Sequence, residues 1–595
     1  MTVSEYIFNY IAERGCQTVY MVSGSSAMWL SDALCRNNQL QAVCCHHEQA
    51  AAMAADGYGR VNGIPGICLV TIGPGATNAV TGVAQAYLDS SPMIVLSGQA
   101  NSHLLEYEKE TKIRQHGTQS LNLEPMVGSI TKYFAEVMKP EDIRYHMERA
   151  YFEAMDGRKG PVWIDVPVDV QNMQVPEQMI GYEPEEDSIQ ACYKYVNYSS
   201  SDNAVIFRVI DMLCNAEKPL ILAGYGIRSA GACRELLQLI EMLNIPVVTS
   251  RGGIDVIGSE HSLYIGRPGS YGDRASHFAI QDCDGLLILG SRLSVSTIGY
   301  YPKQLAGNAL KIMVDIDDKE LAKEDVPVDI KIHADLKVFM SALLQELLHQ
   351  GIKKQHQDWI RRCHDWKEKY PVVQSGYASE TPLNEYYFTK LLSEETSGNA
   401  NVIVDTGSVC NIVSQTWIIK ENQRYLISGG LSCMGFWATS IGAVQEGRQT
   451  IAITGDGSAQ MNIQELATLQ YNKLPIKLFV YNNNGYMLIR HNQHNYMNDR
   501  FIGVGPDSGL RTPDFYKVAD AYGLKSIRIV KGDNIQDRIR QVLEAEEPVL
   551  CEVMVQEFAP IIPRIASKVM PDGSLKAADF DDLYPFLDNK DKELI

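Results

Sequence analysis

The sequence predicts an α/β protein made of three doubly wound parallel-sheet domains. Short apolar runs that suit fully buried strands alternate with helical stretches along most of the 595 residues. A chain of this length is expected to divide into about three or four domains, because a single hydrophobic core stops growing well below that size. The composition, 45% hydrophobic and 21% charged, is typical of a soluble globular protein.

Three blocks of strand–helix alternation define the predicted domains, and a shorter segment follows them. They are residues 1–180, 200–345 and 375–562, with a tail or lid at 563–595. Buried strands are expected at 18–22, 66–71, 92–97, 161–166, 219–223, 245–249, 285–289, 311–315, 449–454 and 476–481. A polar loop at about 181–202 and a charged helical linker at about 340–372 are expected to separate the blocks.

The charge and cysteine content exclude several classes of partner. A net charge of -19 argues against nucleic acid and anionic membrane surfaces. The N-terminus reads as an amphipathic helix, and no apolar run reaches the roughly 18 residues of a membrane span. Thirteen cysteines without a CxxC pattern favour reduced thiols, and hence a cytoplasmic protein, over a disulfide framework.

The most informative motif lies in the third block, where two predicted strands end in polar residues. The apolar run at 449–454 leads into Gly455-Asp456-Gly457, a helical pattern follows, and the next run at 476–481 ends at Asn482-Asn483. Neighbouring parallel strands end at the same edge of a sheet, so these polar groups are expected to lie together. An ordinary Asp-Gly turn and a polar loop are the alternative interpretation.

The oxygen donors of this motif suit a magnesium ion. Asp456 offers a carboxylate, Asn483 an amide oxygen, and the turn at Gly485 a backbone carbonyl. Magnesium typically takes few protein ligands and completes its octahedron with phosphate and water. Gly455 and Gly457 would let the backbone approach a diphosphate at a helix N-terminus. The spacing resembles the thiamine diphosphate signature, GDG followed about two dozen residues later by NN.

A second segment, residues 44–60, brings a carboxylate to the start of an alanine-rich helix. In thiamine diphosphate enzymes a glutamate at this place hydrogen-bonds the pyrimidine nitrogen N1′ and so promotes loss of the thiazolium C2 proton. Glu48 matches that position. The resemblance implies a dry site in which burial raises the pKa of the carboxyl group. A first-turn glutamate favoured by the helix dipole is the alternative interpretation.

A third segment, residues 431–436, precedes the metal motif. The family places a large apolar residue under the thiazolium ring to hold the cofactor bent, and Met434 matches it, although methionine is also a common core filler. The loop at 405–411 matches a diphosphate-binding loop, with Ser408-Val409 in place of the family's Gln-His. The resemblance therefore implies cofactor contacts from Glu48, Pro74, Asn78, Gly407, Ser408, Cys433, Met434, Gly455, Asp456, Gly457, Ser458, Asn483, Gly485, Tyr486 and Met487.

Almost the whole chain resembles the acetolactate synthase and pyruvate oxidase group. Residues 73–78 match its active-site loop, and residues 160–170 match the end of its first domain. The resemblance implies a pyrimidine-binding, a central and a diphosphate-binding domain, in this order. It also implies a homodimer or homotetramer in which Glu48 of one subunit meets the metal motif of another.

The resemblance implies decarboxylation of a 2-oxo acid, with pyruvate as the expected donor, and transfer of the acyl carbanion to a carbonyl acceptor. The chemistry belongs to the cofactor, which the protein positions and desolvates. Acetolactate synthases carry an arginine for the acceptor's carboxylate where this chain has Ser296, and a tryptophan where it has Asn492. A pocket with these changes would fit a ketone with many hydroxyls, such as a nucleotide-linked keto sugar.

Two loop residues are candidates for catalysis beside Glu48. Gln119 matches an active-site glutamine of the synthases, and His116 lies in a loop where related decarboxylases use histidines for proton transfer. A solvated loop histidine is the alternative. Two other functions stay open: a 2-oxo acid decarboxylase without an acceptor, and a non-catalytic subunit. Intact Glu48, Asp456 and Asn483 argue against the latter.

The same group often holds FAD in its central domain, and the sequence leaves flavin open here. The glycine-rich turns at 224–226 and 266–272 and the acidic turn at 315–317 fall near the relevant strand ends. Ser294 and Val295 stand where the family has two aspartates. Glycine turns after strands need no nucleotide to explain them.

Overall fold

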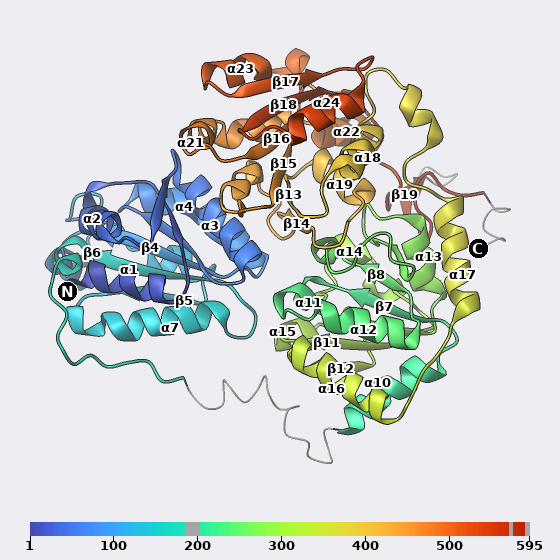
Figure 1. Cartoon of the computed structure of the whole chain (residues 1–595), viewed down its shortest axis with the longest axis horizontal. Coiled ribbons are helices and arrows are strands. Elements are labelled where there is room, and N and C mark those ends of the chain that lie inside the picture. Colours follow the sequence, from blue (N-terminus) through green and yellow to red (C-terminus); the bar gives the residue numbers. More distant parts are fainter. Residues whose placement is uncertain (185–202, 570–574, 589–595) are drawn as a thin grey trace. The chain divides into compact units, whose positions relative to one another are not determined.

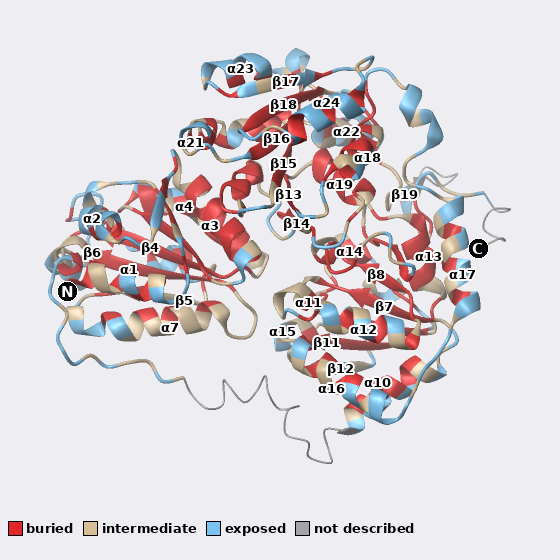
Figure 2. Cartoon of the chain, viewed as in Figure 1, coloured by how far each residue is buried: buried red, intermediate tan, exposed pale blue. Residues whose placement is uncertain are grey.

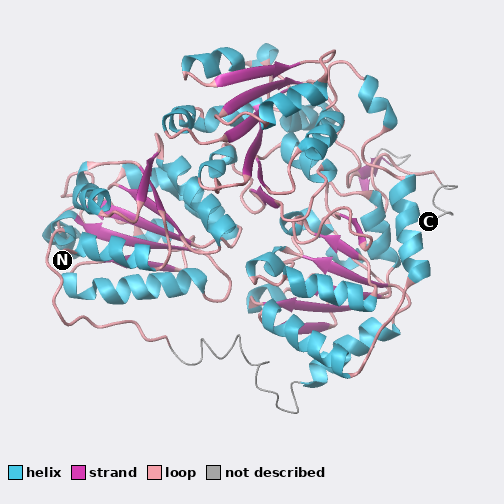
Figure 3. Ribbon diagram, viewed as in Figure 1, coloured by secondary structure: helices cyan, strands magenta, loops and turns pink. Residues whose placement is uncertain are grey.

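The computed structural model describes residues 1–184, 203–569 and 575–588. These residues form three six-stranded parallel sheets, with helices on both sides, and one two-stranded antiparallel hairpin (Figures 1 and 3). The predicted fold class is confirmed. Most of the loop predicted at 181–202 and parts of the predicted tail, 570–574 and 589–595, lie outside the described residues. No helix in the described part of the chain is both long and apolar enough to cross a membrane.

The described chain forms two compact units, and the first of them holds two of the sheets. It comprises residues 1–184, 399–410 and 424–558. The strand order is β2-β1-β3-β4-β6-β5 in the first sheet and β14-β13-β15-β16-β18-β17 in the third. Their strands are β1 (Thr18–Met21), β2 (Gln41–Cys44), β3 (Gly66–Val70), β4 (Met93–Gln99), β5 (Tyr133–Glu136), β6 (Pro161–Pro167), β13 (Ala400–Val404), β14 (Arg424–Ile427), β15 (Gln449–Gly455), β16 (Ile476–Asn482), β17 (Lys525–Ile529) and β18 (Val549–Met554).

Helices cover both sheets of the first unit. The N-terminal amphipathic helix is present, and Thr2 and Glu5 form a capping box at its start. The helices around the first sheet are α1 (Val3–Glu13), α2 (Met28–Arg36), α3 (Glu48–Asn62), α4 (Pro74–Leu88), α5 (Ser102–Thr111), α6 (Glu124–Val127), α7 (Ile143–Met155) and α8 (Val168–Gln171). Those around the third are α19 (Ser408–Thr416), α20 (Asp456–Ala459), α21 (Glu465–Tyr471), α22 (Met487–Met497), α23 (Phe515–Ala521) and α24 (Ile535–Leu543), with short 3-10 turns η6 (Phe436–Ile441) and η7 (Gln460–Asn462).

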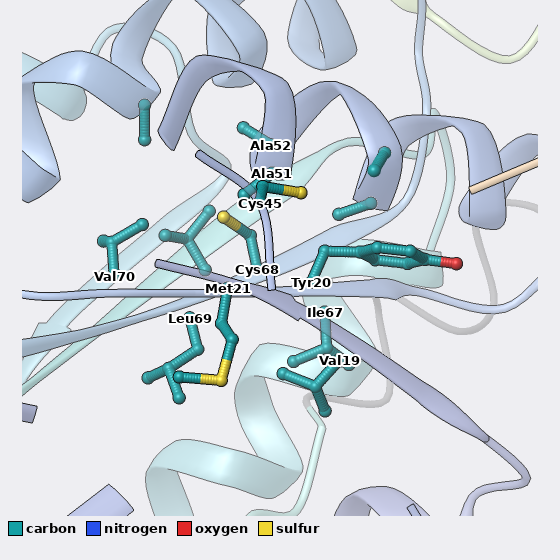
Figure 4. Close-up of a cluster of buried hydrophobic side chains, with 14 of the residues drawn as sticks. Val19, Tyr20, Met21, Cys45, Ala51, Ala52, Ile67, Cys68, Leu69 and Val70 are labelled. Carbon is teal, nitrogen blue, oxygen red and sulfur yellow. The ribbon is translucent and has the colours of Figure 1, made fainter. Parts of the chain in front are cut away.

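The first sheet is buried on both faces, which explains its near-continuous apolar strands. Figure 4 shows Cys68 directed toward Ala51 and Ala52 of α3 and Tyr20 on the same face of the sheet, while Ile67 and Val19 point to the opposite face. Small residues on α3 let it lie close to the sheet. The central strands of all three sheets are buried in the same way (Figure 2), whereas edge strands such as β2, β12 and β17 are partly exposed.

The second unit contains the second sheet, with the order β12-β11-β10-β7-β8-β9. One face packs against α10, α12 and α16, and the other against α13 and α17. The elements are β7 (Pro219–Ala223), β8 (Val247–Thr249), β9 (Tyr264–Gly266), β10 (Gly285–Leu289), β11 (Leu310–Asp315), β12 (Ile330–His333), α10 (Asn203–Asn215), α11 (Tyr225–Ser229), α12 (Cys233–Leu243), α13 (Arg274–Asp282), α14 (Val295–Ile298), α15 (Asp318–Leu321), α16 (Leu336–His349), α17 (Gln357–Lys369) and α18 (Glu385–Glu395).

The charged stretch at about 340–372 is helical as predicted, but the prediction of a linker is wrong. α16 belongs to the core of the second unit, and α17 buries Trp359, Cys363 and Trp366 against α13 and the sheet. The charged residues occupy the solvent face of an amphipathic helix, which gave the stretch its linker-like composition.

The described part of the C-terminal segment packs on the second unit. β19 (Ser567–Val569) and β20 (Leu575–Ala577) pair antiparallel. Phe580 stacks on the buried ring of His277, with 4.2 Å between ring centroids, and its carbonyl accepts a hydrogen bond from His277 Nδ1 at 2.6 Å. These residues are therefore part of a folded core.

Candidate active site

Asp456 lies at the carboxyl edge of the third sheet and joins the two halves of the predicted metal motif. β15 leads into Asp456, and its parallel neighbour β16 leads into the turn that carries Asn483 and Gly485. The Gly485 N–H donates to Asp456 Oδ2 at 2.8 Å, and the Gly457 N–H donates to Oδ1 at 2.9 Å. The strand ends thus meet at one edge of the sheet.

The surroundings of Asp456 suit a cation. Burial raises the pKa of its carboxyl group to about 6, against the opposing effect of hydrogen bonds from Gly485, Thr512 and Gly457. The charge of Arg490 also lowers the pKa of Asp456, but no ion pair with a lysine, arginine or histidine joins it in the described part of the chain. A buried carboxylate is costly unless it is paired or coordinates a metal. With Asn483 also buried, the donor set fits a divalent ion.

The glycines of the motif have different structural roles. A β-carbon at Gly457 would lie 2.1 Å from Cε1 of Tyr486, so the tyrosine ring needs a glycine there. At Gly455 the nearest atom would be 3.5 Å away, in Val409, which is ordinary contact. Met487 is buried and begins α22 directly after Tyr486.

The diphosphate side of the predicted site is formed by the turn after β13. Gly407 has φ of +84°, and a β-carbon there would meet nothing within 4 Å. Ser408 follows as the first residue of α19, and Asp456 is the first residue of α20. Two helices therefore begin at the same sheet edge, where their N-termini favour negative charge. This geometry fits a diphosphate group.

Asp405 begins the predicted diphosphate-binding loop at 405–411 but was not itself predicted as a site residue, and it holds the loop that carries Met434. Its buried carboxylate accepts the Thr454 hydroxyl at 2.9 Å and the backbone N–H groups of Phe436 at 3.2 Å and Trp437 at 3.3 Å. Burial raises the pKa of Asp405, while these donors oppose that change. The signal that could have found it is an acidic residue at the end of a third neighbouring strand.

Ser458 fixes the same loop from the other side of the motif. Its hydroxyl accepts the N–H of Gly435 at 2.8 Å, and Gly435 follows Met434 directly. Asn462 Nδ2 donates to the Gly435 carbonyl at 2.8 Å. The predicted cofactor residues Ser458 and Met434 are thus linked through one backbone position.

Asp89 of the first sheet's helices holds the beginning of the Met434 loop. Its carboxylate accepts the N–H of Gly429 at 2.9 Å, the N–H of Gly430 at 2.7 Å, and Arg60 Nη2 at 3.0 Å, together with a short bond from Gln85. A β-carbon at Gly430 would lie 2.5 Å from Leu88 Cβ, so the approach needs glycine. The loop is therefore fixed at both ends.

Cys433, a predicted cofactor contact, faces protein atoms in this arrangement. Its thiol donates to Gln85 Oε1 at 3.1 Å, and its N–H donates to Ser428 Oγ at 2.9 Å. Burial raises the pKa of the Cys433 thiol to about 12. The thiol is therefore protonated at neutral pH and weakly nucleophilic.

Glu48 is the first residue of α3 and is only partly buried in the single chain. Asn78 Nδ2 donates to Glu48 Oε2 at 3.0 Å. A β-carbon at Gly75 would lie 3.5 Å from Glu48 Oε1, so the carboxylate rests on the start of α4. Asn78, predicted to touch the cofactor, orients Glu48 in this structure.

The turn before Glu48 is held by the buried carboxylate of Glu465 on α21. The N–H of His46 donates to Glu465 Oε1 at 3.0 Å, and the Thr468 hydroxyl donates to Oε2 at 2.6 Å. His46 Nδ1 also lies 3.0 Å from the Thr468 hydroxyl. No sequence pattern pointed to this contact across 419 residues.

Gln119 lies beside the predicted loop at 73–78. A β-carbon at Gly73 would lie 2.8 Å from the Gln119 carbonyl oxygen, and Gly73 has φ of +61°. Pro74 is exposed at the first position of α4, where proline suits a helix start. Asn78 thus contacts Glu48 directly, and Gln119 adjoins Gly73, the residue before Pro74, at the same edge of the first sheet.

His116 is exposed, and its ring lies 4.9 Å from the Tyr107 ring, centroid to centroid. Glu108 shapes this loop by accepting the N–H groups of His116 and Gly117 and the Ser120 hydroxyl. Burial acts to raise the pKa of Glu108, but these hydrogen bonds outweigh it and lower the pKa. The exposure of His116 agrees with both predicted roles, proton transfer and simple solvation.

A buried network supports the Gln119 loop from within the first sheet. Asp165 accepts the Ser97 hydroxyl and Gln99 Nε2, the latter at 3.0 Å. Gln99 Nε2 also donates to the Leu121 carbonyl at 3.1 Å. Burial raises the pKa of Asp165 from 3.8 to about 7, against these hydrogen bonds.

This network predicts a pH dependence of stability. The folded carboxyl group of Asp165 keeps a proton that the unfolded one loses, between its ordinary pKa of 3.8 and about 7. Stability contributed by the wild-type residue therefore falls as pH rises through that window. We expect the melting temperature of wild type, relative to Asp165→Asn, to be higher at about pH 5 than at about pH 8. A difference independent of pH would contradict this assignment.

The structure thus gathers the predicted residues into two sets within the first unit. One lies at the edge of the first sheet with Glu48, and the other lies around Asp456. Among the described residues, no hydrogen bond joins Glu48 to Asp456 or Asn483. Arg490 and Thr512 also contact the second set, although the sequence gave no signal for either.

The chain is similar to known proteins over nearly its whole length. Three family models match the chain: the N-terminal TPP binding domain of thiamine pyrophosphate enzymes over residues 1–126, their central domain over 206–343, and their C-terminal TPP binding domain over 405–553. A probable acetolactate synthase large subunit of Methanocaldococcus jannaschii is 32% identical, covering 99% of each chain. The acetolactate synthase large subunit of Lactococcus lactis is 31% identical over 96% of this chain and 95% of its own, and the isozyme 2 large subunit of Escherichia coli K12 is 29% identical over 95% and 98%.

Proposed function

The chain belongs to the thiamine pyrophosphate enzymes, in the group of the acetolactate synthase large subunits, and from this membership we propose that it decarboxylates pyruvate and joins the remaining acyl group to a second carbonyl compound. The observation that best supports this function is the contact between Asp456 and the Asn483–Gly485 turn. In the reaction, the bond between C1 and C2 of pyruvate breaks and carbon dioxide leaves. A new carbon–carbon bond then forms to the acceptor, whose oxygen takes a proton.

Thiamine diphosphate, when bound, supplies the electron sink for the pair that decarboxylation leaves behind. Asp456, Asn483 and the Gly485 carbonyl would hold a magnesium ion, and the helix starts at Ser408 and Asp456 would face the diphosphate. Met434 would support the ring from a loop fixed at both ends.

Glu48 would exchange a proton with the pyrimidine ring, with Asn78 holding its second oxygen in place. Gln119 and His116 lie on the loop next to it and are the candidates for substrate contact and proton transfer. The buried network at Gln99 holds that loop to the sheet.

A second copy of the chain would complete the site. Glu48 is only partly buried, and the described chain offers it no hydrogen bond from the metal motif. A carboxyl group that must work in a dry site needs a cover, and we propose that the metal-motif face of another subunit provides it. The active unit would then be a homodimer or a homotetramer.

The proposed acceptor is a polyhydroxylated ketone, such as a nucleotide-linked keto sugar. Ser296, at the arginine position of the synthases, lies in α14 with its hydroxyl 2.8 Å from that of Ser294. Asn492, at the tryptophan position, is exposed on α22. Neither side chain offers a cation for a second 2-oxo acid.

Product analysis tests this acceptor preference. With pyruvate and a panel of ketones and aldehydes, we expect mass spectrometry to show addition to sugar ketones and little acetolactate. Ser296→Arg should raise acetolactate formation by roughly 10-fold or more, because a charge-assisted hydrogen bond contributes about 1.5–3 kcal/mol. Ordinary acetolactate synthesis by the wild-type enzyme, with sugar ketones ignored, would refute the proposed acceptor.

No flavin is needed for the proposed reaction, because decarboxylation and carbon–carbon bond formation involve no net oxidation. The predicted flavin turns also have a packing role: a β-carbon at Gly224 would lie 2.1 Å from the Gly290 carbonyl oxygen, and one at Gly226 would lie 2.7 Å from Gly290 Cα. We therefore assign no flavin step to the central domain.

A cytoplasmic location is proposed on cysteine use. All cysteines in the described part of the chain are free thiols. Reduced thiols in such number are characteristic of a reducing compartment.

A further inference from the structure

The turn that carries Asn483 and Gly485 lacks regular secondary structure, so other residues must hold its shape. Asn484 has φ of 60° and Gly485 has φ of 138°, both outside the conformations that most residues prefer. Magnesium demands near-ideal octahedral geometry. A turn that relaxed into another conformation would therefore lose affinity for the ion.

Arg490 on α22 folds back onto this turn. Its Nη2 donates to the carbonyl oxygens of Asn484 and Val504, each at 2.9 Å. Its Nη1 donates to the Glu557 carbonyl and makes a longer contact of 3.4 Å with the Asn483 carbonyl. One planar guanidinium thus joins three separate segments of backbone around the predicted metal ligands.

Val504 is the point where the neighbouring segment meets the turn. The N–H of Tyr486 donates to the Val504 carbonyl at 3.0 Å, the same carbonyl that Arg490 binds. A β-carbon at Gly485 would lie 2.1 Å from that oxygen, so only glycine permits this approach. Arg490 therefore stabilises a close backbone contact at the very residue expected to offer its carbonyl to the ion.

Thr512 holds the carboxylate of Asp456, as Arg490 holds the turn. Its hydroxyl donates to Asp456 Oδ2 at 3.1 Å, and the Gly485 N–H donates to the same oxygen at 2.8 Å. The Gly457 N–H binds the other oxygen at 2.9 Å. These three donors fix the rotation of the carboxylate, and Thr512 is the only side chain among the hydrogen-bond donors to Asp456 in the described structure.

We propose that Arg490 and Thr512 are positioning residues that set the affinity for the divalent ion. Arg490 holds the turn that offers Asn483 and Gly485, and Thr512 orients Asp456, although neither would touch the metal. Outer residues of this kind typically change metal affinity by about 10- to 100-fold. Lysine cannot replace Arg490, because its donors radiate from one atom and do not form a planar fork. This inference depends on one part of the proposed function, which is that a divalent ion binds at Asp456 and Asn483.

Manganese titration followed by electron paramagnetic resonance, with thiamine diphosphate present, tests the proposal. We expect Thr512→Val to bind Mn²⁺ about 10- to 100-fold more weakly than wild type, and Thr512→Ser, which keeps the hydroxyl, to bind nearly as well as wild type. Arg490→Lys should also bind more weakly, whereas Arg500→Lys, at an exposed arginine just beyond the same helix, should not. Saturating Mg²⁺ should restore the turnover number of Thr512→Val.

Equal Mn²⁺ affinity in wild type and Thr512→Val would overturn the proposal. If Arg490→Lys fails to fold, the comparison of Thr512→Val with Thr512→Ser still tests the proposal. If the wild-type protein binds no Mn²⁺ in the presence of thiamine diphosphate, the proposed metal site itself is refuted. If wild type binds Mn²⁺ and the variants bind it equally well, only the positioning role is refuted.

Discussion

Replacing Glu48 with glutamine is expected to lower turnover by roughly 100- to 10,000-fold, the range that positioned proton transfer contributes. Glutamine has nearly the same shape and can still meet Asn78, so the first turn of α3 should persist. It cannot share a proton with a pyrimidine ring. The expected signature is therefore lost activity with an unchanged melting temperature and unchanged binding of the cofactor.

The matched control is Glu124→Gln, because Glu124 is an exposed glutamate in the first turn of another helix, α6. If Glu48 served only to complement the helix dipole, both variants would behave alike. Full turnover in Glu48→Gln would contradict the proposed mechanism.

Asp456→Asn is expected to abolish the stabilisation that cofactor and metal give the protein. A ligand at about 100 times its dissociation constant stabilises by about 2.7 kcal/mol, so the wild-type melting temperature should rise when thiamine diphosphate and Mg²⁺ are added together. The variant lacks the charged oxygen that the ion requires, and its melting temperature should not change on addition.

Without ligands, the stability of the same variant should differ little from that of wild type, because two effects oppose each other: the amide NH2 leaves the N–H of Gly457 or Gly485 without an acceptor, and the neutral side chain removes a buried charge. Burial raises the pKa of Asp456 to about 6, so the charged carboxylate is unfavourable in the empty fold at neutral pH and a neutral amide relieves that cost. Chelation of the metal from wild type should reproduce the loss of ligand stabilisation. Cofactor stabilisation retained by Asp456→Asn would contradict the proposed site.

The parts of the site that sequence could predict follow from strand order. A parallel strand ending in Asp456 and a neighbour ending in Asn483 must meet at one edge, and the Gly485–Asp456 hydrogen bond confirms that they do. The strands that were predicted are all present, because buried parallel strands are almost continuously apolar. Other strands of the same sheets, such as the partly exposed β17, were not predicted.

The contacts that sequence could not predict cross long intervals of chain. Asp89 binds backbone 340 positions away, and Glu465 binds His46 across 419. Such contacts leave no local periodicity. The role of Arg490 could not be predicted for another reason. Its hydrogen-bond partners are backbone carbonyl groups, which every residue has, so no residue type marks the contact.

The distance between Asp89 and its backbone partners has a consequence while the protein is being made. At about 5–20 residues per second, a ribosome needs roughly 17 to 70 seconds to add the 340 residues between them. During that interval Arg60, Asp89 and the turn at His46 lack the partners from later in the chain that they have in the finished structure. Residues 203–398, which make up most of the described second unit, are synthesised in the meantime, so the first unit can complete its contacts only late in synthesis.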